Sequence, residues 1–194
     1  MKLNKVAVIF GTMMIMSAGI AHAADGDGGG GDKKTTTVSG GTVHFRGSLV
    51  DAACAVSSDS SDQIVTMGQY TLHHFKKIGD KSGSVPFKIK LEDCDSTVAS
   101  TAAMAFIGQQ DSVKKDLLAI DTGSGNTSTA TGVAIQILDE SSKALTPDGA
   151  TFSTPHKLID GMNILSFSAQ YVSTSATPTA GEANADATFI MQYQ

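Results

Sequence analysis

The sequence predicts an all-β protein, an antiparallel β-sandwich of the immunoglobulin type. Charged residues make up 17% of its 194 residues, below the ~25% usual in soluble proteins, which disfavours a surface of charged helices. Apolar residues recur at every second position in several short runs, and turn-forming residues separate these runs. The chain also carries two cysteines. Short strands, turns and one possible disulfide together favour a sandwich.

Residues 1–23 have the features of a secretory signal. Lys2 and Lys5 precede an apolar stretch over 6–20, and Ala21-His22-Ala23 fits a small-x-small cleavage site. A membrane anchor is the alternative, but it needs ~20 apolar residues, and the polar run 25–28 ends the stretch too early. We therefore expect cleavage, and no direct membrane insertion of the mature chain.

The charge balance excludes nucleic acid as a partner. The net charge is −5, from 14 Lys and Arg against 19 Asp and Glu, and loss of Lys2 and Lys5 leaves 12 against 19, or −7. Arg46 is the single arginine. Binding to a phosphate backbone needs clustered positive charge, which this chain lacks.

Export also bears on the two cysteines, Cys54 and Cys94. In an oxidising compartment, an even pair without C-x-x-C spacing predicts one structural disulfide, closing a loop of about 40 residues. A metal site or a nucleophilic thiol would need a histidine or a base nearby, and the sequence alone shows none.

The mature chain divides into a leader and a region of strands. Residues 24–36 are rich in Gly and Asp and predict a flexible segment. Residues 111–120 are the one stretch compatible with a helix. The run from Thr37 through Leu49 toward Cys54 predicts an extended segment followed by a strand. Alternation predicts the further strands at Ile64/Thr66, Val85–Leu91, Ala102–Phe106, Val133–Ile137, Leu165–Tyr171 and Ala185–Tyr193.

No pattern in the sequence predicts catalysis. Asp25, Asp27 and Asp32 match a calcium loop only in part, since Thr36 stands where the bidentate Glu belongs. Adjacent side chains such as His73 and His74 chelate one ion poorly. Asp93 and Asp95 flank Cys94 and could pair as an acid and a base, but a turn cap is the better interpretation. We expect no enzyme activity, catalytic residue, metal or cofactor.

The two ends of the chain suggest a role in assembly. Apolar residues alternate from Ala183 to Tyr193, so the last strand is expected at a sheet edge open to another chain. Residues 37–45 form a second alternating segment, tethered through the Gly-rich leader. An open edge and a tethered strand in one chain are the two halves of a head-to-tail contact, which builds a fibre.

Four stretches resemble the pilins of chaperone–usher fimbriae, most of all the major subunit of type 1 pili. They are Gly40-Gly41-Thr42-Val43-His44-Phe45-Arg46-Gly47, Asp51-Ala52-Ala53-Cys54-Ala55-Val56, Leu91-Glu92-Asp93-Cys94 and the C-terminal run from Ala183 to Gln194. The last stretch is the most specific. Tyr193 is penultimate, Gly181 is fourteenth from the end, and Met191, Phe189 and Ala187 are fourth, sixth and eighth from it.

The resemblance implies an incomplete immunoglobulin-like fold for residues 48–194, lacking its last strand. A periplasmic chaperone fills the resulting groove along the C-terminal edge, and at the outer-membrane usher the extension of the next pilin subunit replaces it. Residues 37–47 are then the donor extension, and Gly41 matches the small residue at which exchange starts. By resemblance, the donor positions are Thr37, Ser39, Gly41, Val43 and Phe45, and the C-terminal edge carries Gly181, Ala187, Phe189, Met191 and Tyr193.

The resemblance also implies a disulfide between Cys54 and Cys94 and a place in a fimbrium on the bacterial surface, reached through the periplasm. One departure is the leader over 24–36, because the extension in this family usually begins close to the mature N-terminus. Two alternatives stay open: a minor subunit of the same system, acting as adaptor, initiator or terminator, and a self-contained secreted β-sandwich that binds a ligand.

Overall fold

The computed structural model describes residues 35–121 and 128–194. Its contacts divide the chain into two units, Met1–Arg46 and Gly47–Gln194. The predicted signal 1–23 and all of the predicted leader except 35–36 lie outside the described residues. Residues 35–46 form no helix or strand, and their apolar side chains are exposed, Val43 to 74% and Phe45 to 91%.

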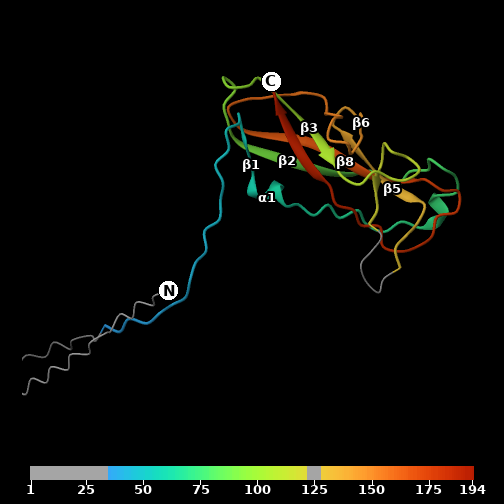
Figure 1. Cartoon of the computed structure of the whole chain (residues 1–194), viewed down its shortest axis with the longest axis horizontal. Helices are drawn as coiled ribbons and strands as arrows, with labels where there is room; N and C mark the ends of the chain where they lie inside the picture. Colours follow the sequence, from blue (N-terminus) through green and yellow to red (C-terminus); the bar gives the residue numbers. More distant parts are fainter. Residues whose placement is uncertain (1–34, 122–127) are drawn as a thin grey trace, which may run out of the picture. The chain divides into compact units, whose positions relative to one another are not determined.

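The second unit is built almost entirely of strands (Figure 1). Among the described residues, its helical elements are a four-residue helix and one turn of 3-10 helix. In chain order the elements are β1 (Ala55–Val56), α1 (Ser58–Ser61), η1 (Leu72–His74), β2 (Val85–Cys94), β3 (Thr101–Ile107), β4 (Leu118–Ala119), β5 (Val133–Asp139), β6 (Ala144–Leu145), β7 (His156–Lys157), β8 (Gly161–Ser173) and β9 (Thr188–Tyr193).

The strands form two antiparallel sheets. One has the order β1-β2-β8-β5-β4, with β6 also paired to β5, and the other has the order β7-β3-β9. The longest pairing joins β2 to β8, where Val85 lies opposite Ala169 and Leu91 opposite Asn163. In the smaller sheet Ala102 lies opposite Tyr193 and Ile107 opposite Thr188. This arrangement confirms the all-β, immunoglobulin-like fold class.

The core contains side chains from both sheets. β2 buries alternate side chains over much of its length, whereas β3 buries all five residues from Ala102 to Phe106. Leu91 of β2, Leu165 of β8, Ile137 of β5 and Met104 of β3 are almost completely buried in one cluster. Period-2 alternation with one apolar face is the pattern that predicts these strands from the sequence. A disulfide joins Cys54, just before β1, to Cys94 at the end of β2, as the sequence predicts.

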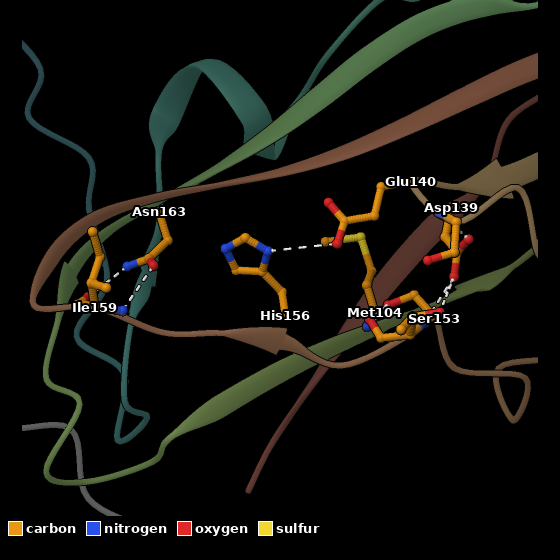
Figure 2. A network of polar contacts seen from close by, with 9 residues as sticks. Met104, Asp139, Glu140, Ser153, His156, Ile159 and Asn163 are labelled. Atoms are coloured by element: carbon orange, nitrogen blue, oxygen red, sulfur yellow. Dashed lines mark hydrogen bonds and ion pairs between the residues drawn. The ribbon is translucent and has the colours of Figure 1, made fainter.

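A buried carboxylate fixes the far end of β5. Asp139 Oδ1 accepts the backbone N–H of Lys143 at 2.9 Å, and Oδ2 accepts both the N–H and the hydroxyl of Thr154 at 2.8 Å. Figure 2 shows Asp139 beside the contact in which Ser153 Oγ accepts the N–H of Met104. These bonds tie the β5–β6 hairpin to the segment before β7 and satisfy the polar groups buried there.

Three stretches differ from what the sequence predicts. The run from Thr37 toward Cys54, which was expected to include a strand, contains none, because β1 begins only at Ala55. Residues 63–70, where a strand was expected around Ile64 and Thr66, form no strand, since no neighbouring segment pairs with them. Residues 111–120, the one stretch compatible with a short helix, instead form a turn followed by β4. Asp111 Oδ1 accepts the N–H groups of Val113 and Lys114 and so closes the turn, and Leu118 then pairs with Ile135.

Candidate functional site

The unit Gly47–Gln194 contains an open groove of about 950 Å³ whose lining is largely apolar. Segment 63–69 forms one wall, and segment 183–189, which leads into β9, forms the other. The floor consists of core side chains from both sheets. They are Phe87, Ile89, Phe106, Leu118, Ile135, Ile137, Ala169 and Tyr171.

The β9 wall presents an unused backbone edge. Thr101 and Gln194 exchange two N–H···O bonds of 2.9 and 3.0 Å. In an antiparallel pair, residues that hydrogen-bond to the partner strand alternate with residues whose backbone N–H and C=O groups point away from the partner strand. By this register, Phe189, Met191 and Tyr193 direct their N–H and C=O groups away from β3. Among the described residues, no strand pairs with this edge of β9. The backbone N–H and C=O groups of these three residues are therefore available to pair with another strand.

The opposite wall is also unpaired. Residues 63–69 make no backbone–backbone hydrogen bond within the part of the chain that the structure describes. Their side chains still alternate, because Val65 and Met67 are half-buried while Ile64 is 91% exposed. The segment is therefore strand-like in its side-chain pattern and lacks only a hydrogen-bonding neighbour.

Two phenylalanine rings, Phe87 and Phe106, belong to the floor of the groove, and Phe167 packs against both. Phe87, Phe106 and Phe167 pack together, with ring centroids 5.4 to 6.1 Å apart. Phe167 and Phe106 are buried, whereas Phe87 remains partly exposed. Partial exposure of such a ring at the centre of a core leaves apolar area that an inserted side chain would cover.

Two tyrosines define one end of the groove. The hydroxyl of Tyr171 donates to the carbonyl of Ala183 at 2.7 Å, and the ring of Tyr70 packs edge-on against Tyr171 at 5.9 Å. Burial raises the pKa of Tyr171, and the neighbouring Tyr70 adds to this rise. Tyr171 therefore stays neutral at physiological pH and acts as a fixed hydrogen-bond donor that holds Ala183 in the wall.

The opposite end of β9 is tied to the disulfide. The hydroxyl of Tyr193 donates to the carbonyl of Cys54 at 3.3 Å, and burial raises the pKa of Tyr193. The backbone N–H of Ser100 also donates to the Gln194 carbonyl at 2.8 Å. The wall segment that leads into β9 is thus anchored at Ala183 by Tyr171, and the far end of β9 is anchored beside the disulfide by Tyr193.

The predicted C-terminal residues fall into two groups. Phe189, Met191 and Tyr193 lie in β9 and pack against the core, whereas Gly181 and Ala187 precede the strand. Gly181 lies so close to the backbone of 128–130 that a Cβ atom there would collide with Ser128, Thr129 and Ala130. The structure does not test the roles assigned to these residues or to Thr37, Ser39, Gly41, Val43 and Phe45.

Sequence reasoning misses the second wall and the tyrosine pair. The alternation at 64–67 is a usable signal, but it predicts an ordinary paired strand. The alternation of β8 predicts only that Tyr171 faces the core, like the other residues of its parity. The hydrogen bond from Tyr171 to Ala183 joins β8 to a different segment, so the spacing of residues within β8 could not predict it.

The other candidate sites have structural roles or none. Asp95 caps a turn, accepting the N–H and the hydroxyl of Thr97, and these bonds lower its pKa. His73 and His74 are exposed on η1. Within residues 35–121 and 128–194, no three His, Cys, Asp or Glu side chains gather as a metal site requires. No helix in the described ranges is long and apolar enough to cross a bilayer.

Fold and groove together define a class of protein. An immunoglobulin-like sandwich with an apolar floor and two unpaired backbone walls is a strand acceptor, which a β-strand from another molecule can complete.

Comparison with known proteins agrees with this class and identifies the family. The family model described as fimbrial protein matches residues 43–194, so the chain belongs to the fimbrial protein family. It is 52% identical over 181 residues to the type-1 fimbrial protein A chain of Salmonella typhi, covering 93% of this chain and 94% of that protein. It is 44% identical to the Escherichia coli type-1 fimbrial protein A chain over 195 residues, the full length of both.

Solved structures show the same likeness. A subunit from a chaperone–usher pilus superposes with a TM-score of 0.68 at 30% identity, over 83% of this chain and 99% of that one. The P pilus rod subunit PapA gives a TM-score of 0.61 at 29% identity, over 74% of this chain and all of that one. The protein is therefore a structural subunit of a chaperone–usher fimbria on the bacterial surface, exported through the periplasm. Its partners are other pilin subunits, a chaperone and an usher.

Proposed function

We propose that the chain polymerises head to tail by donor-strand exchange, in which residues 37–47 of one copy fill the groove of another. The unused edge of β9 carries this proposal. Thr37, Ser39, Gly41, Val43 and Phe45 are the positions whose side chains enter the groove. The subunit performs no catalytic reaction, and its function is the mechanical one of linking copies into a fibre.

The lengths of donor and groove agree. Residues 37–45 span about 30 Å when extended, at ~3.3 Å per residue. The β9 wall, from Ala183 to Tyr193, is eleven residues long by the numbering and of similar extent. A donor strand of this length reaches both the tyrosine pair and the disulfide end of the groove.

The donor segment 37–47 carries exposed apolar side chains that insertion into the groove would bury. Val43 and Phe45 are 74% and 91% exposed in the free segment. Burying each in an apolar site contributes about 1.5 to 3 kcal/mol. The same event pairs the open backbone groups of Phe189, Met191 and Tyr193. Apolar burial and hydrogen bonding are thus gained together, and dissociation must lose both at once.

The Gly47–Gln194 unit alone also explains the need for a chaperone. Its groove exposes apolar floor and unpaired edge, and such surfaces pair with other chains when unprotected. We assign to the periplasmic chaperone the temporary covering of the β9 edge, including Ala187, Phe189 and Met191, until the usher brings in the next donor. Gly41 is the small position at which the incoming strand starts to displace it.

Thermal unfolding tests the proposal. A subunit of residues 48–194, refolded with its disulfide, is heated with and without a peptide of residues 35–47. We expect the peptide to raise the Tm by tens of degrees and to remain bound after dilution. The control peptide carries Val43→Asp and Phe45→Asp and should have no effect. A subunit that already unfolds cooperatively at high temperature and ignores both peptides has a complete fold, which would exclude donor-strand exchange.

A further inference from the structure

Exposed apolar side chains project from two neighbouring turns at the end of the domain that carries the disulfide. Val98, Ile159 and Met162 are 67%, 62% and 59% exposed. Asp160 Oδ1 accepts the N–H of Ser96 at 2.9 Å and its hydroxyl at 2.6 Å, which holds the two turns side by side. Apolar residues gathered in this way mark interaction surfaces more often than isolated ones do.

Both turns are rigidly built. Asp95 Oδ1 accepts the N–H of Thr97 at 2.8 Å in the first turn. In the second turn the buried Asn163 side chain accepts from the N–H of Ile159 at 3.0 Å and donates to its carbonyl at 2.7 Å (Figure 2). Side chains held on fixed backbone lose little conformational entropy when they bind a partner.

Acidic residues surround these apolar side chains. Glu92, Asp93, Asp95 and Asp160 are all exposed, and the first three lie at the end of β2 while Asp160 directly precedes β8. We define the disulfide end as Val98, Ile159, Met162, Glu92, Asp93, Asp95 and Asp160.

At the opposite end of β2 and β8, exposed apolar side chains lie among basic residues instead of acidic ones. We define the lysine end as Leu72, Ile78, His73, His74, Lys76, Lys77 and Lys81. Leu72 and Ile78 are 43% and 55% exposed, and the five basic residues are exposed as well. The one acid of this segment, Asp80, is engaged by the N–H groups of Lys76 and Lys77 at 2.8 and 2.9 Å.

The two surfaces lie at opposite ends of the sandwich. Lys81 bridges to Val172 near the end of β8, whereas Asp160 directly precedes the start of that strand. The ten residues of β2 separate the ends by about 33 Å, at ~3.3 Å per residue. In Figure 1 the C-terminus and β1 mark the disulfide end, and β2 runs from the far side of the molecule toward it.

We propose that successive copies of this chain also bind each other end to end, the disulfide end of one against the lysine end of the next. This proposal rests on donor-strand exchange and adds a second contact to it. The donor extension joins its own domain at residue 47, seven residues before Cys54 at the disulfide end. The acceptor groove is lined in part by Tyr171, whose ring contacts Tyr70, two residues before Leu72 of the lysine end. Apolar side chains then meet apolar ones, and carboxylates meet lysines.

Complementary charge of this kind acts mainly on the association rate. Fibre growth from chaperone-bound subunits is therefore measured at 20 mM and 500 mM salt. The variants are Lys77→Glu, Glu92→Lys and the double variant, with Lys88→Glu as the matched control on the outer face of β2. Lys77 and Lys88 are both exposed. We expect each end variant to slow growth about three- to tenfold at low salt, the double variant to recover most of this loss, and Lys88→Glu to match the original chain.

The effect should shrink at high salt because ions screen exposed charges. Uptake of the 35–47 peptide is measured on every variant as the separate readout of the groove. If all variants bind the peptide but Lys77→Glu grows like Lys88→Glu, or the double variant shows no recovery, the end-to-end contact is wrong while donor-strand exchange stands. If the original chain does not bind the peptide, donor-strand exchange itself fails.

Discussion

The hydroxyl of Tyr193 donates a hydrogen bond to the backbone carbonyl of Cys54, from the last strand to the disulfide. These two residues are 139 positions apart. The bond ties the end of β9 to the residue directly before β1.

Tyr193→Phe should weaken this connection without opening a cavity. We expect the free energy of unfolding of the free subunit to fall by about 1 kcal/mol, the usual net contribution of one hydrogen bond. Urea unfolding measures it. Tyr171→Phe, which loses the bond to Ala183 at the other end, is the companion variant. No change in Tyr193→Phe would show that the ring alone positions β9.

Gly181→Ala should destabilise the subunit because a Cβ atom at 181 collides with the backbone of residues 128–130. Backbone cannot move aside as a flexible side chain can, so we expect a loss of about 2 to 3 kcal/mol, in the upper part of the range for single substitutions. Gly83→Ala is the control, since its Cβ would meet only Tyr70 Oη at 3.7 Å. Equal stability of the two variants would contradict the close approach.

Asp139 should contribute to acid sensitivity. Burial alone would raise its pKa, but hydrogen bonds from Thr154, Lys143 and Ser141 outweigh burial and lower the pKa below the ordinary 3.8. Because the folded pKa is depressed, the stabilisation is present above about pH 4 and is lost as pH falls through the folded value. Asp139→Asn should be less stable at pH 7 and should flatten the fall in stability below pH 4. A parallel curve for the variant would show that other carboxylates cause the fall.

Gly41→Trp should block fibre assembly while the free subunit keeps its stability, because a large side chain cannot enter where the donor backbone approaches the groove closely. Fibre yield by electron microscopy and unfolding of the free subunit are measured in parallel. His44→Trp is the control, since residue 44 has the opposite parity to the donor positions. Normal fibres from Gly41→Trp would remove Gly41 from the mechanism.

Cys54→Ala should impair folding before assembly. The disulfide closes a loop between positions 40 residues apart, for which chain entropy predicts about 4 kcal/mol. Such a loss is a large part of the stability of a domain of this size. The periplasmic level of free subunit measures the effect, and an unchanged level would contradict it.

The sequence predicts those strands whose one face is buried by the rest of the same chain. β2, β3, β5, β8 and β9 all fall on alternating runs, since both sheets cover their apolar faces. Alternation could not distinguish segment 63–69 from these strands, because it reports burial of side chains and not the presence of a hydrogen-bonding neighbour. The turn at Asp111 escapes prediction for a similar reason, since two side-chain bonds decide it against a weak helical spacing.

The alternation over 183–193 predicts strand β9, but no spacing in the sequence predicts the groove floor. Phe87 and Phe167 lie opposite each other in the paired strands β2 and β8, and the packing of the second sheet brings Phe106 of β3 against them. The resemblance to pilins supplies the missing strand as an expectation, which no pattern of spacing in the chain could provide.

Because the backbone of residues 63–69 is unpaired, the kinetic order of the last folding step depends on where the missing strand comes from. A monomeric domain completes its fold in a step of first order, and its stability does not depend on its concentration. On the proposed mechanism, the final strand comes from a different molecule, so this chain finishes folding in a bimolecular step. Its stability is then a property of the population, set by how many neighbours are within reach, and the subunit at the growing end of each fibre is the one whose fold is still incomplete.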